Sequence, residues 1–89
     1  MDRLYARVEG RVQGVGFRYH AMTQALALGL SGWVTNLPDG SVELEAQGSP
    51  RVLRQFVAFL ERGPGASRVL RVETSPRPTD PGEKGFHIR

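Results

Sequence analysis

The turn sequence "LPDG" at residues 37–40 constrains the fold of this chain more than any other stretch. Proline presets the φ angle and glycine tolerates the left-handed region, so Pro-Asp-Gly is typical of a tight turn. On its two sides lie "SGWVTN" (31–36) and "SVELEAQ" (41–47), and the second alternates between apolar and polar residues. Such alternation predicts a strand with one buried face, and two strands around a tight turn predict a β-hairpin.

Segments with helical features lie on both sides of the hairpin. The first, Arg18–Leu28, is followed by Gly29, a residue type that commonly ends helices. In the second, Ser49 can cap the helix, Pro50 suits its first position, and a Gly-Pro pair at 63–64 ends it. The apolar residues of the first are Ala21, Met22, Ala25, Leu26 and Leu28; those of the second are Leu53, Phe56, Val57 and Leu60.

Strands are predicted at both ends of the chain. Leu4, Ala6 and Val8 share one face of an alternating segment near the start. The segment "SRVLRVETS" at 67–75 predicts a further strand with Leu70 and Val72 directed inward. After a loop at 76–85, "FHIR" at 86–89 predicts a short last strand.

The resulting order is strand, helix, strand, strand, helix, strand, which forms two split β-α-β units. We therefore expect a ferredoxin-like α/β sandwich of the α+β class. Its antiparallel four-stranded sheet would be extended by the short C-terminal strand, with two helices on one face. A length of 89 residues fits a single domain over residues 1–89. The fold alone does not identify a function.

Charge and composition limit the classes of partner. The formal net charge is +3, with eleven arginines against one lysine, and no basic run of five residues occurs. This charge permits nucleic acid, an anionic membrane surface or a small anionic substrate. The chain has no cysteine, which excludes disulfides and thiolate metal sites. Without a long apolar run or a recognisable signal peptide, we expect a cytoplasmic protein that does not engage a membrane.

The glycine-rich segment "GRVQGVGFR" connects the first strand to the first helix. Backbone N–H groups at a helix N-terminus favour an anion, and glycines at 14 and 16 allow successive amides to turn inward. Arg18 adds a guanidinium that can bind two phosphate oxygens at once. The spacing fits neither a Walker A loop nor a dinucleotide fingerprint. From these residues alone, a phosphate-binding loop and a plain connector with a solvated Arg18 both remain open.

Two segments together resemble the acylphosphatase family. The first matches the family signature V-x-G-x-V-Q-G-V-x-F-R at Val8, Gly10, Val12, Gln13, Gly14, Val15, Phe17 and Arg18. The second matches G-[aromatic]-V-x-N-x-x-x-G-x-V-x5-G at Gly32, Trp33, Val34, Asn36, Gly40, Val42 and Gly48. Thr35 departs from this pattern, because members of the family often carry a longer or basic residue there. On a strand, its side chain points to the opposite face from that of Asn36.

This resemblance implies an enzyme that hydrolyses acyl phosphates to a carboxylate and inorganic phosphate without metal or cofactor. In the family, loop amides and an arginine bind the phosphate, an asparagine positions the attacking water, and the substrate's own phosphate oxygen accepts the proton. The implied partners are therefore a small acyl phosphate and its phosphate product, and we expect a monomer. Carried over, phosphate binding falls on Gln13, Gly14, Val15, Gly16, Phe17 and Arg18, and catalysis on Arg18 and Asn36.

Other polar residues are interpreted without a catalytic role. His20 lies two residues after Arg18 on the predicted helix, so its side chain points elsewhere and we expect it to be solvated. His87 is expected on the outer face of the last strand, and two distant histidines without cysteine do not indicate zinc. Glu43 and Glu45 fit an exposed sheet face better than a glycosidase pair. Trp33, which could stack a base, fits packing better.

The alternative function is a ferredoxin-like binding module. RNA-recognition domains share the fold, but their aromatic strand motif is absent from "SVELEAQ", which carries two acidic residues and no aromatic. A small-molecule regulatory or maturation domain, such as one handling carbamoyl phosphate, would share both signatures. Such domains usually lie in much longer chains. We expect no specific binding of nucleic acid.

Overall fold

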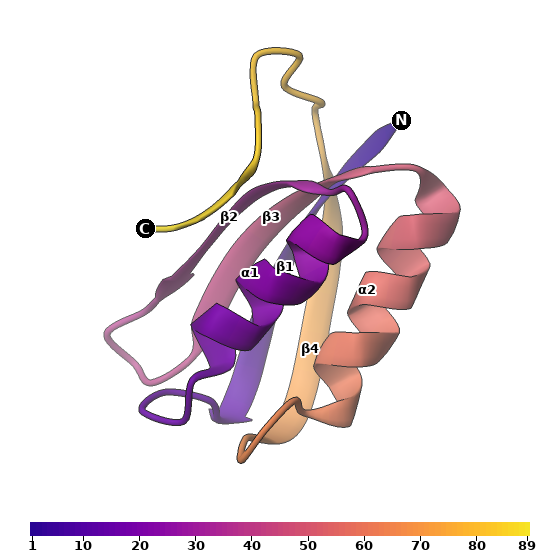
Figure 1. Ribbon diagram of the computed structural model, residues 1–89. Coiled ribbons are helices and arrows are strands. Elements are labelled where there is room, and N and C mark those ends of the chain that lie inside the picture. The colour runs from indigo at the N-terminus through magenta and orange to yellow at the C-terminus, as the bar shows by residue number, and fades with distance from the viewer.

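The computed structural model describes residues 1–89, and both helices pack on one face of a five-stranded sheet (Figure 1). The elements in chain order are β1 (Asp2–Arg11), α1 (Phe17–Ala27), β2 (Ser31–Asn36), β3 (Val42–Gly48), α2 (Pro50–Arg62), β4 (Arg68–Arg77) and β5 (Phe86–Ile88). The predicted order of strands and helices and the ferredoxin-like fold are confirmed.

Strand β1 lies inside the sheet, whose order is β4-β1-β3-β2-β5 and whose central strand is β3. It pairs antiparallel with β3 on one side and with β4 on the other. Strands β2 and β3 form the predicted antiparallel hairpin, with Asn36 opposite Val42 at the turn. Strand β5 runs parallel to β2, with Ile88 opposite Val34, so the complete sheet is mixed.

The bounds of α2 follow from residues visible in the sequence. The Ser49 hydroxyl accepts a hydrogen bond of 3.3 Å from the Val52 amide, and Pro50 is the first helical residue. Gly63 ends the helix in the left-handed conformation, with a φ of 75°. These three residues confirm the predicted start and end of the helix.

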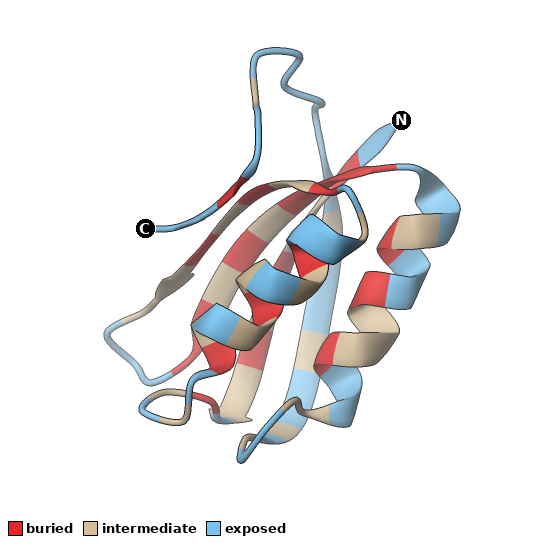
Figure 2. Ribbon diagram, viewed as in Figure 1, coloured by how far each residue is buried: buried red, intermediate tan, exposed pale blue.

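The hydrophobic core lies between the helices and the sheet (Figure 2). The predicted inward positions of β3, Val42, Leu44 and Ala46, are all fully buried. The same holds for Ala6 and Val8 on β1. Alternation in the sequence therefore identifies the face of the central strands that packs against the helices.

The prediction that Leu70 points inward is wrong, because its side chain is 83% exposed. Glu9 pairs with Arg71 and Gly10 with Val69, so Leu70 is an extra residue in a β-bulge. A Cβ on Gly10 would lie 2.1 Å from the Arg68 carbonyl oxygen, and only glycine fits this approach. The bulge reverses the alternation, and Val69 packs against the core in place of Leu70.

The face of the sheet opposite the helices carries a network of ion pairs and hydrogen bonds. Arg3, only 6% exposed, contacts Glu45 at 2.7 Å and Glu83 at 2.9 Å. The Gln47 side chain donates to the Asp80 carbonyl at 2.9 Å and accepts from the Asp80 amide at 2.6 Å. These contacts hold the segment 78–85 in place before it leads into β5. None of the helices is long and apolar enough to cross a membrane.

Candidate active site

The loop between β1 and α1 presents its backbone at the start of a helix. Gly14 and Gly16 adopt left-handed φ angles of 73° and 80°. Gly16 is the N-cap residue of α1, and no side chain caps the helix there. The first amides of α1 therefore remain available to an anion, as expected for a helix N-terminus.

Apolar residues anchor this loop on both sides of the glycines. Val12 and Phe17 are each 1% exposed and belong to the hydrophobic core, while Val15 packs against it. Gly14 and Gly16 between them are exposed. The alternation of anchors and glycines fixes the loop while turning its backbone toward the surface.

Arg18 lines a cavity of about 190 Å³ beside this loop. It forms no ion pair with any carboxylate, so its guanidinium is free to bind an anion. The residues around the cavity are Val12, Gly14, Gly16, Phe17, Arg18, Tyr19 and Ile88. The structure therefore brings Arg18 together with the two glycines and Phe17.

The Gln13 side chain lies at the β2–β3 turn. Its Nε2 donates hydrogen bonds of 2.7 Å to the Leu37 carbonyl and 2.9 Å to the Ser41 carbonyl. Only the backbone of Gln13 therefore remains for an anion at the loop. The side chain ties the loop to the hairpin that carries Asn36.

Asn36 ends β2, directly before the Leu37 carbonyl that Gln13 binds. Its Oδ1 atom is buried and accepts no hydrogen bond from the protein. An unsatisfied buried carbonyl oxygen is costly and marks a position that calls for a functional explanation. Asn36 does not line the cavity beside Arg18. It is linked to the glycine loop through the hairpin turn, whose Leu37 and Ser41 carbonyls accept the hydrogen bonds from Gln13.

Asp39 stabilises the same turn. It accepts hydrogen bonds from the hydroxyl and the backbone amide of Ser41, the latter at 2.9 Å, and one from the Arg7 guanidinium. These interactions lower the pKa of Asp39 to about 2, and the hydrogen bonds from Ser41 contribute most to the shift. The turn thus holds the Ser41 carbonyl that binds Gln13.

The family model for acylphosphatase matches residues 4–88. This chain belongs to the acylphosphatase family. It is 50% identical to an acylphosphatase of Thermus thermophilus over 88 residues, covering 99% of both chains. The crystal structure of acylphosphatase from Bacillus subtilis superimposes with a TM-score of 0.95 at 37% identity, covering 100% of this chain and 99% of that one.

A longer protein contains the same fold. The structure of HypF from T. kodakarensis matches 100% of this chain with a TM-score of 0.83 and 30% identity, but only 12% of that protein is covered. By contrast, the two acylphosphatases match this chain over nearly their whole length.

His20 is partly exposed, and its ring lies beside two glycines, Gly16 and Gly65. A Cβ on Gly65 would lie 2.8 Å from its Nε2 atom, and one on Gly16 would lie 3.7 Å from its Cδ2 atom. The ring therefore bridges the glycine loop and the α2–β4 turn. No local signal predicts this contact, since Gly65 is distant in the sequence.

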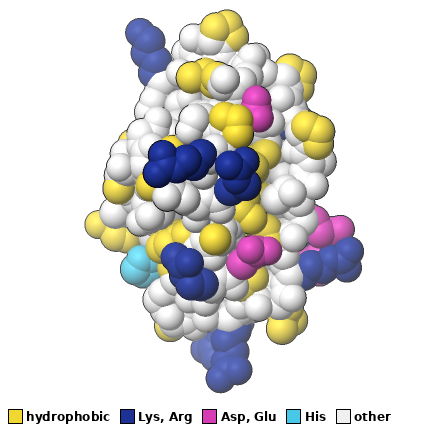
Figure 3. Space-filling model, turned by 90° about the vertical axis from the view of Figure 1, so that its right-hand side faces the viewer, with side chains coloured by type: hydrophobic (Ala, Val, Ile, Leu, Met, Phe, Trp, Pro, Cys, Tyr) yellow, Lys and Arg dark blue, Asp and Glu magenta, His cyan; other side chains and the backbone are white.

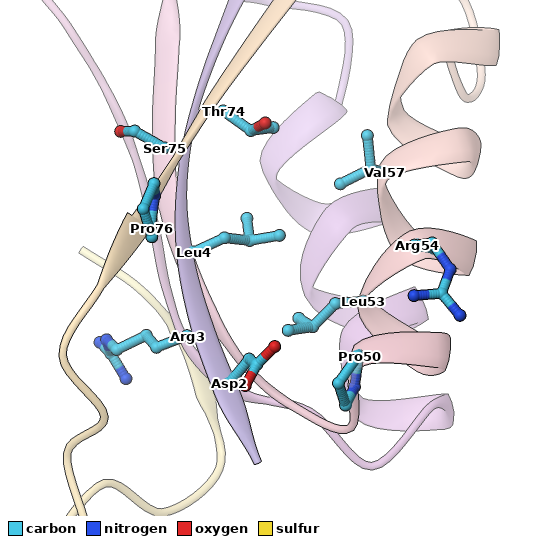
Figure 4. A pocket seen from close by; sticks show the side chains of 10 residues that line it. All are labelled: Asp2, Arg3, Leu4, Pro50, Leu53, Arg54, Val57, Thr74, Ser75 and Pro76. Carbon is cyan, nitrogen blue, oxygen red and sulfur yellow. The ribbon is translucent and has the colours of Figure 1, made fainter.

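The largest cavity, about 420 Å³, lies elsewhere (Figure 4). Leu4, Leu53 and Val57 point into it between β1 and α2, whereas Arg3 points to the other face of the sheet. It adjoins the start of β1, and the glycine loop follows the end of that strand, roughly 25–30 Å away at the usual rise per residue. It carries no glycine loop, so it is not the phosphate site that the family signature indicates.

Basic residues also gather away from the loop. Helix α2 and strand β4 together carry six arginines and two glutamates. Figure 3 shows the side of the molecule where basic side chains surround small apolar patches.

No group of three or more His, Asp or Glu side chains is placed to hold a metal ion. Among the residues lining the cavity beside the loop, the positive charge is that of Arg18.

Proposed function

We propose that this chain hydrolyses acyl phosphates at its Gln13–Arg18 loop, releasing a carboxylate and inorganic phosphate. The observation that carries the proposal is the uncapped start of α1, with left-handed Gly14 and Gly16 beside an Arg18 free of ion pairs. Amides of Gln13 to Phe17 would bind phosphate oxygens, and the Arg18 guanidinium would bind two of them.

Asn36 would orient the attacking water. Its buried Oδ1 accepts no hydrogen bond from the protein and can accept one from water, while the amide group stays neutral. The water oxygen attacks phosphorus, the bond from phosphorus to the acyl oxygen breaks, and the carboxylate leaves with the electron pair. The proton of the water passes to a phosphate oxygen of the substrate.

This reaction needs little help from a protein acid or base. A carboxylate is a good leaving group, so positioning and stabilisation of charge on the phosphoryl oxygens can supply the catalysis. The hydrogen bonds from Gln13 to Leu37 and Ser41 support the division of roles, because they fix the loop relative to the strand that ends at Asn36.

We also propose that the protein binds no nucleic acid specifically. The two aromatic rings on the open face of the sheet are covered, since the Arg77 guanidinium lies 4.6 Å from the Tyr5 ring and that of Arg89 lies 4.2 Å from the Trp33 ring. Bases therefore find no free stacking platform there. We expect only weak, strongly salt-dependent binding of RNA; a tight, sequence-selective complex would contradict this part.

We further propose that the protein is a monomer, that it is located in the cytoplasm and that residues 1–89 fold as a single domain. A single hydrophobic core joins residues of both helices and of strands from β1 to β5, which supports one domain. Light scattering coupled to size-exclusion chromatography and cell fractionation test the oligomeric state and the location.

The experiment that tests the activity is phosphate release from acetyl phosphate by the purified protein in the presence of EDTA. We expect turnover to persist and inorganic phosphate to inhibit competitively, because the product fits the same loop. Loss of turnover on chelation with recovery on adding magnesium would contradict the metal-independent mechanism. Purely noncompetitive inhibition would contradict a shared phosphate site.

A further inference from the structure

The cavity beside Arg18 has one wall made of exposed apolar side chains. Tyr19 is 61% exposed and Ile88 is 40% exposed, and both line the cavity with the glycine loop. Most other large apolar side chains of this chain are buried or half buried. Exposed apolar side chains that adjoin a polar binding loop are typical of ligand sites, where few polar groups fix orientation and apolar groups supply contact area.

We infer that Tyr19 and Ile88 form the subsite for the acyl group, and that this subsite selects acyl phosphates whose acyl group is apolar and uncharged. The inference rests on the proposed function, because it takes the phosphate to be bound by the loop and Arg18. Of the other side chains that line the cavity, Val12 and Phe17 are buried, so Tyr19 and Ile88 are the ones that an acyl group on the bound phosphate would contact.

The two side chains come from elements that the fold holds beside each other. Tyr19 lies in the first turn of α1, directly after Arg18, and α1 packs against β5. Ile88 is fixed on β5 by its pairing with Val34 and by the hydrogen bond of 2.9 Å from the Arg89 amide to the Val34 carbonyl. The subsite is therefore built into the structure and does not depend on a flexible segment.

The charges around the cavity favour a neutral acyl group. Arg18 is the only charged residue among those that line it, and the proposed function uses this guanidinium for the phosphate. The neighbouring Arg89 guanidinium lies over the Trp33 ring, 4.2 Å from its centre. A second carboxylate or phosphate on the acyl group would lose water without gaining a cation, which is unfavourable.

The test compares kcat/KM for acetyl phosphate and benzoyl phosphate in the wild type and in variants of the wall. We expect the wild type to prefer benzoyl phosphate by about tenfold, as for a few extra apolar carbons in an open site. Ile88→Thr keeps a β-branched residue in the strand, and Tyr19→Gln keeps a helix-compatible one. Combining them should bring the ratio of the two kcat/KM values close to one.

A gain of function separates specificity from damage to the fold. Ile88→Arg should raise kcat/KM for succinyl phosphate relative to acetyl phosphate by about fivefold or more, because it places a cation where the acyl carboxylate lies. Leu26→Gln is the matched control: this side chain is 50% exposed on the same helix but does not line the cavity. It should leave every ratio unchanged.

The outcomes distinguish this inference from the proposed function. If the wild type hydrolyses both substrates and the double variant keeps the wild-type ratio, the acyl subsite is wrong and the proposed function stands. The acyl subsite is also wrong if Leu26→Gln alters the ratio as strongly as the wall variants do. If acetyl phosphate is not hydrolysed at all, the proposed function fails and the inference fails with it.

Discussion

The Gln13 side-chain amide lies 2.7 Å from the carbonyl oxygen of Leu37 and donates a hydrogen bond to it. This contact joins the loop that begins the site to the turn directly after Asn36. A second bond from the same nitrogen, to the Ser41 carbonyl at 2.9 Å, fixes the other side of the turn. One side chain therefore sets the position of the two parts of the proposed site relative to each other.

Gln13→Glu should weaken both the fold and the activity. It keeps the size of the side chain but removes the two N–H donors and places a carboxylate against two carbonyl oxygens. We expect a loss of about 1–3 kcal/mol in the free energy of unfolding, measured by urea denaturation, and a fall in kcat. Gln55→Glu, exposed on α2, is the control and should change neither quantity. An unchanged kcat in Gln13→Glu would show that the hydrogen bonds from Gln13 to Leu37 and Ser41 do not position the site.

Arg18→Ala should weaken phosphate binding and turnover together. The guanidinium is proposed to contact phosphate in both the ground state and the transition state, and losing a bidentate charged contact costs roughly 2–4 kcal/mol. Calorimetric titration with inorganic phosphate and measurement of kcat/KM test this. Arg54→Ala removes an exposed arginine of α2 and controls for the change in net charge. Equal losses in the two variants would mean that net charge alone attracts the phosphate.

Asn36→Ala should lower kcat by about two orders of magnitude while leaving phosphate affinity nearly intact, because the proposed partner of Asn36 is water. Its stability should not fall through a lost hydrogen bond at Oδ1, since that atom accepts none within the protein. The prediction is wrong if the variant keeps a near-normal kcat. It is also wrong if the folded variant loses phosphate binding as severely as Arg18→Ala.

Asp39 should contribute a pH dependence to stability in the acid range. Its hydrogen bonds from Ser41 and then Arg7 lower its pKa from an ordinary value of 3.8 to about 2 in the folded protein. The contribution is therefore complete above about pH 4 and is lost as the pH falls through about 2. Urea midpoints measured across this window should fall less steeply in Asp39→Asn than in the wild type. Glu61→Gln, exposed on α2 and without an ion pair, should follow the wild-type slope.

Features encoded by neighbouring residues could be predicted from the sequence. The turn at 37–40 and the capping residues Ser49, Pro50 and Gly63 act within a few positions of one another, and the structure confirms the hairpin and α2. The orientation of Leu70 could not be predicted, because it depends on Gly10, which lies far away in the chain and imposes the bulge. Alternation alone assumes a regular strand and cannot detect such an interruption.

The candidate site shows the same division. The glycines and Arg18 stand together in one short motif, so their grouping could be predicted. The destination of the Gln13 side chain could not, because its acceptors, Leu37 and Ser41, belong to a hairpin whose placement only the sheet determines. The contact of His20 with Gly65 escapes prediction for the same reason.

The pairing of β1 with β4 has a consequence for how fast this chain reaches its native state. Arg3 lies opposite Arg77, so the two strands that complete this side of the sheet come from near the two ends of the chain. The two strands can pair only after the chain between them has closed into a loop. Closing this loop lowers the conformational entropy of the chain before most of the stabilising contacts have formed. Folding should therefore take milliseconds to seconds, as in other proteins dominated by distant strand pairs. During synthesis, β1 (Asp2–Arg11) gains its second neighbour only after β4 (Arg68–Arg77) has been made.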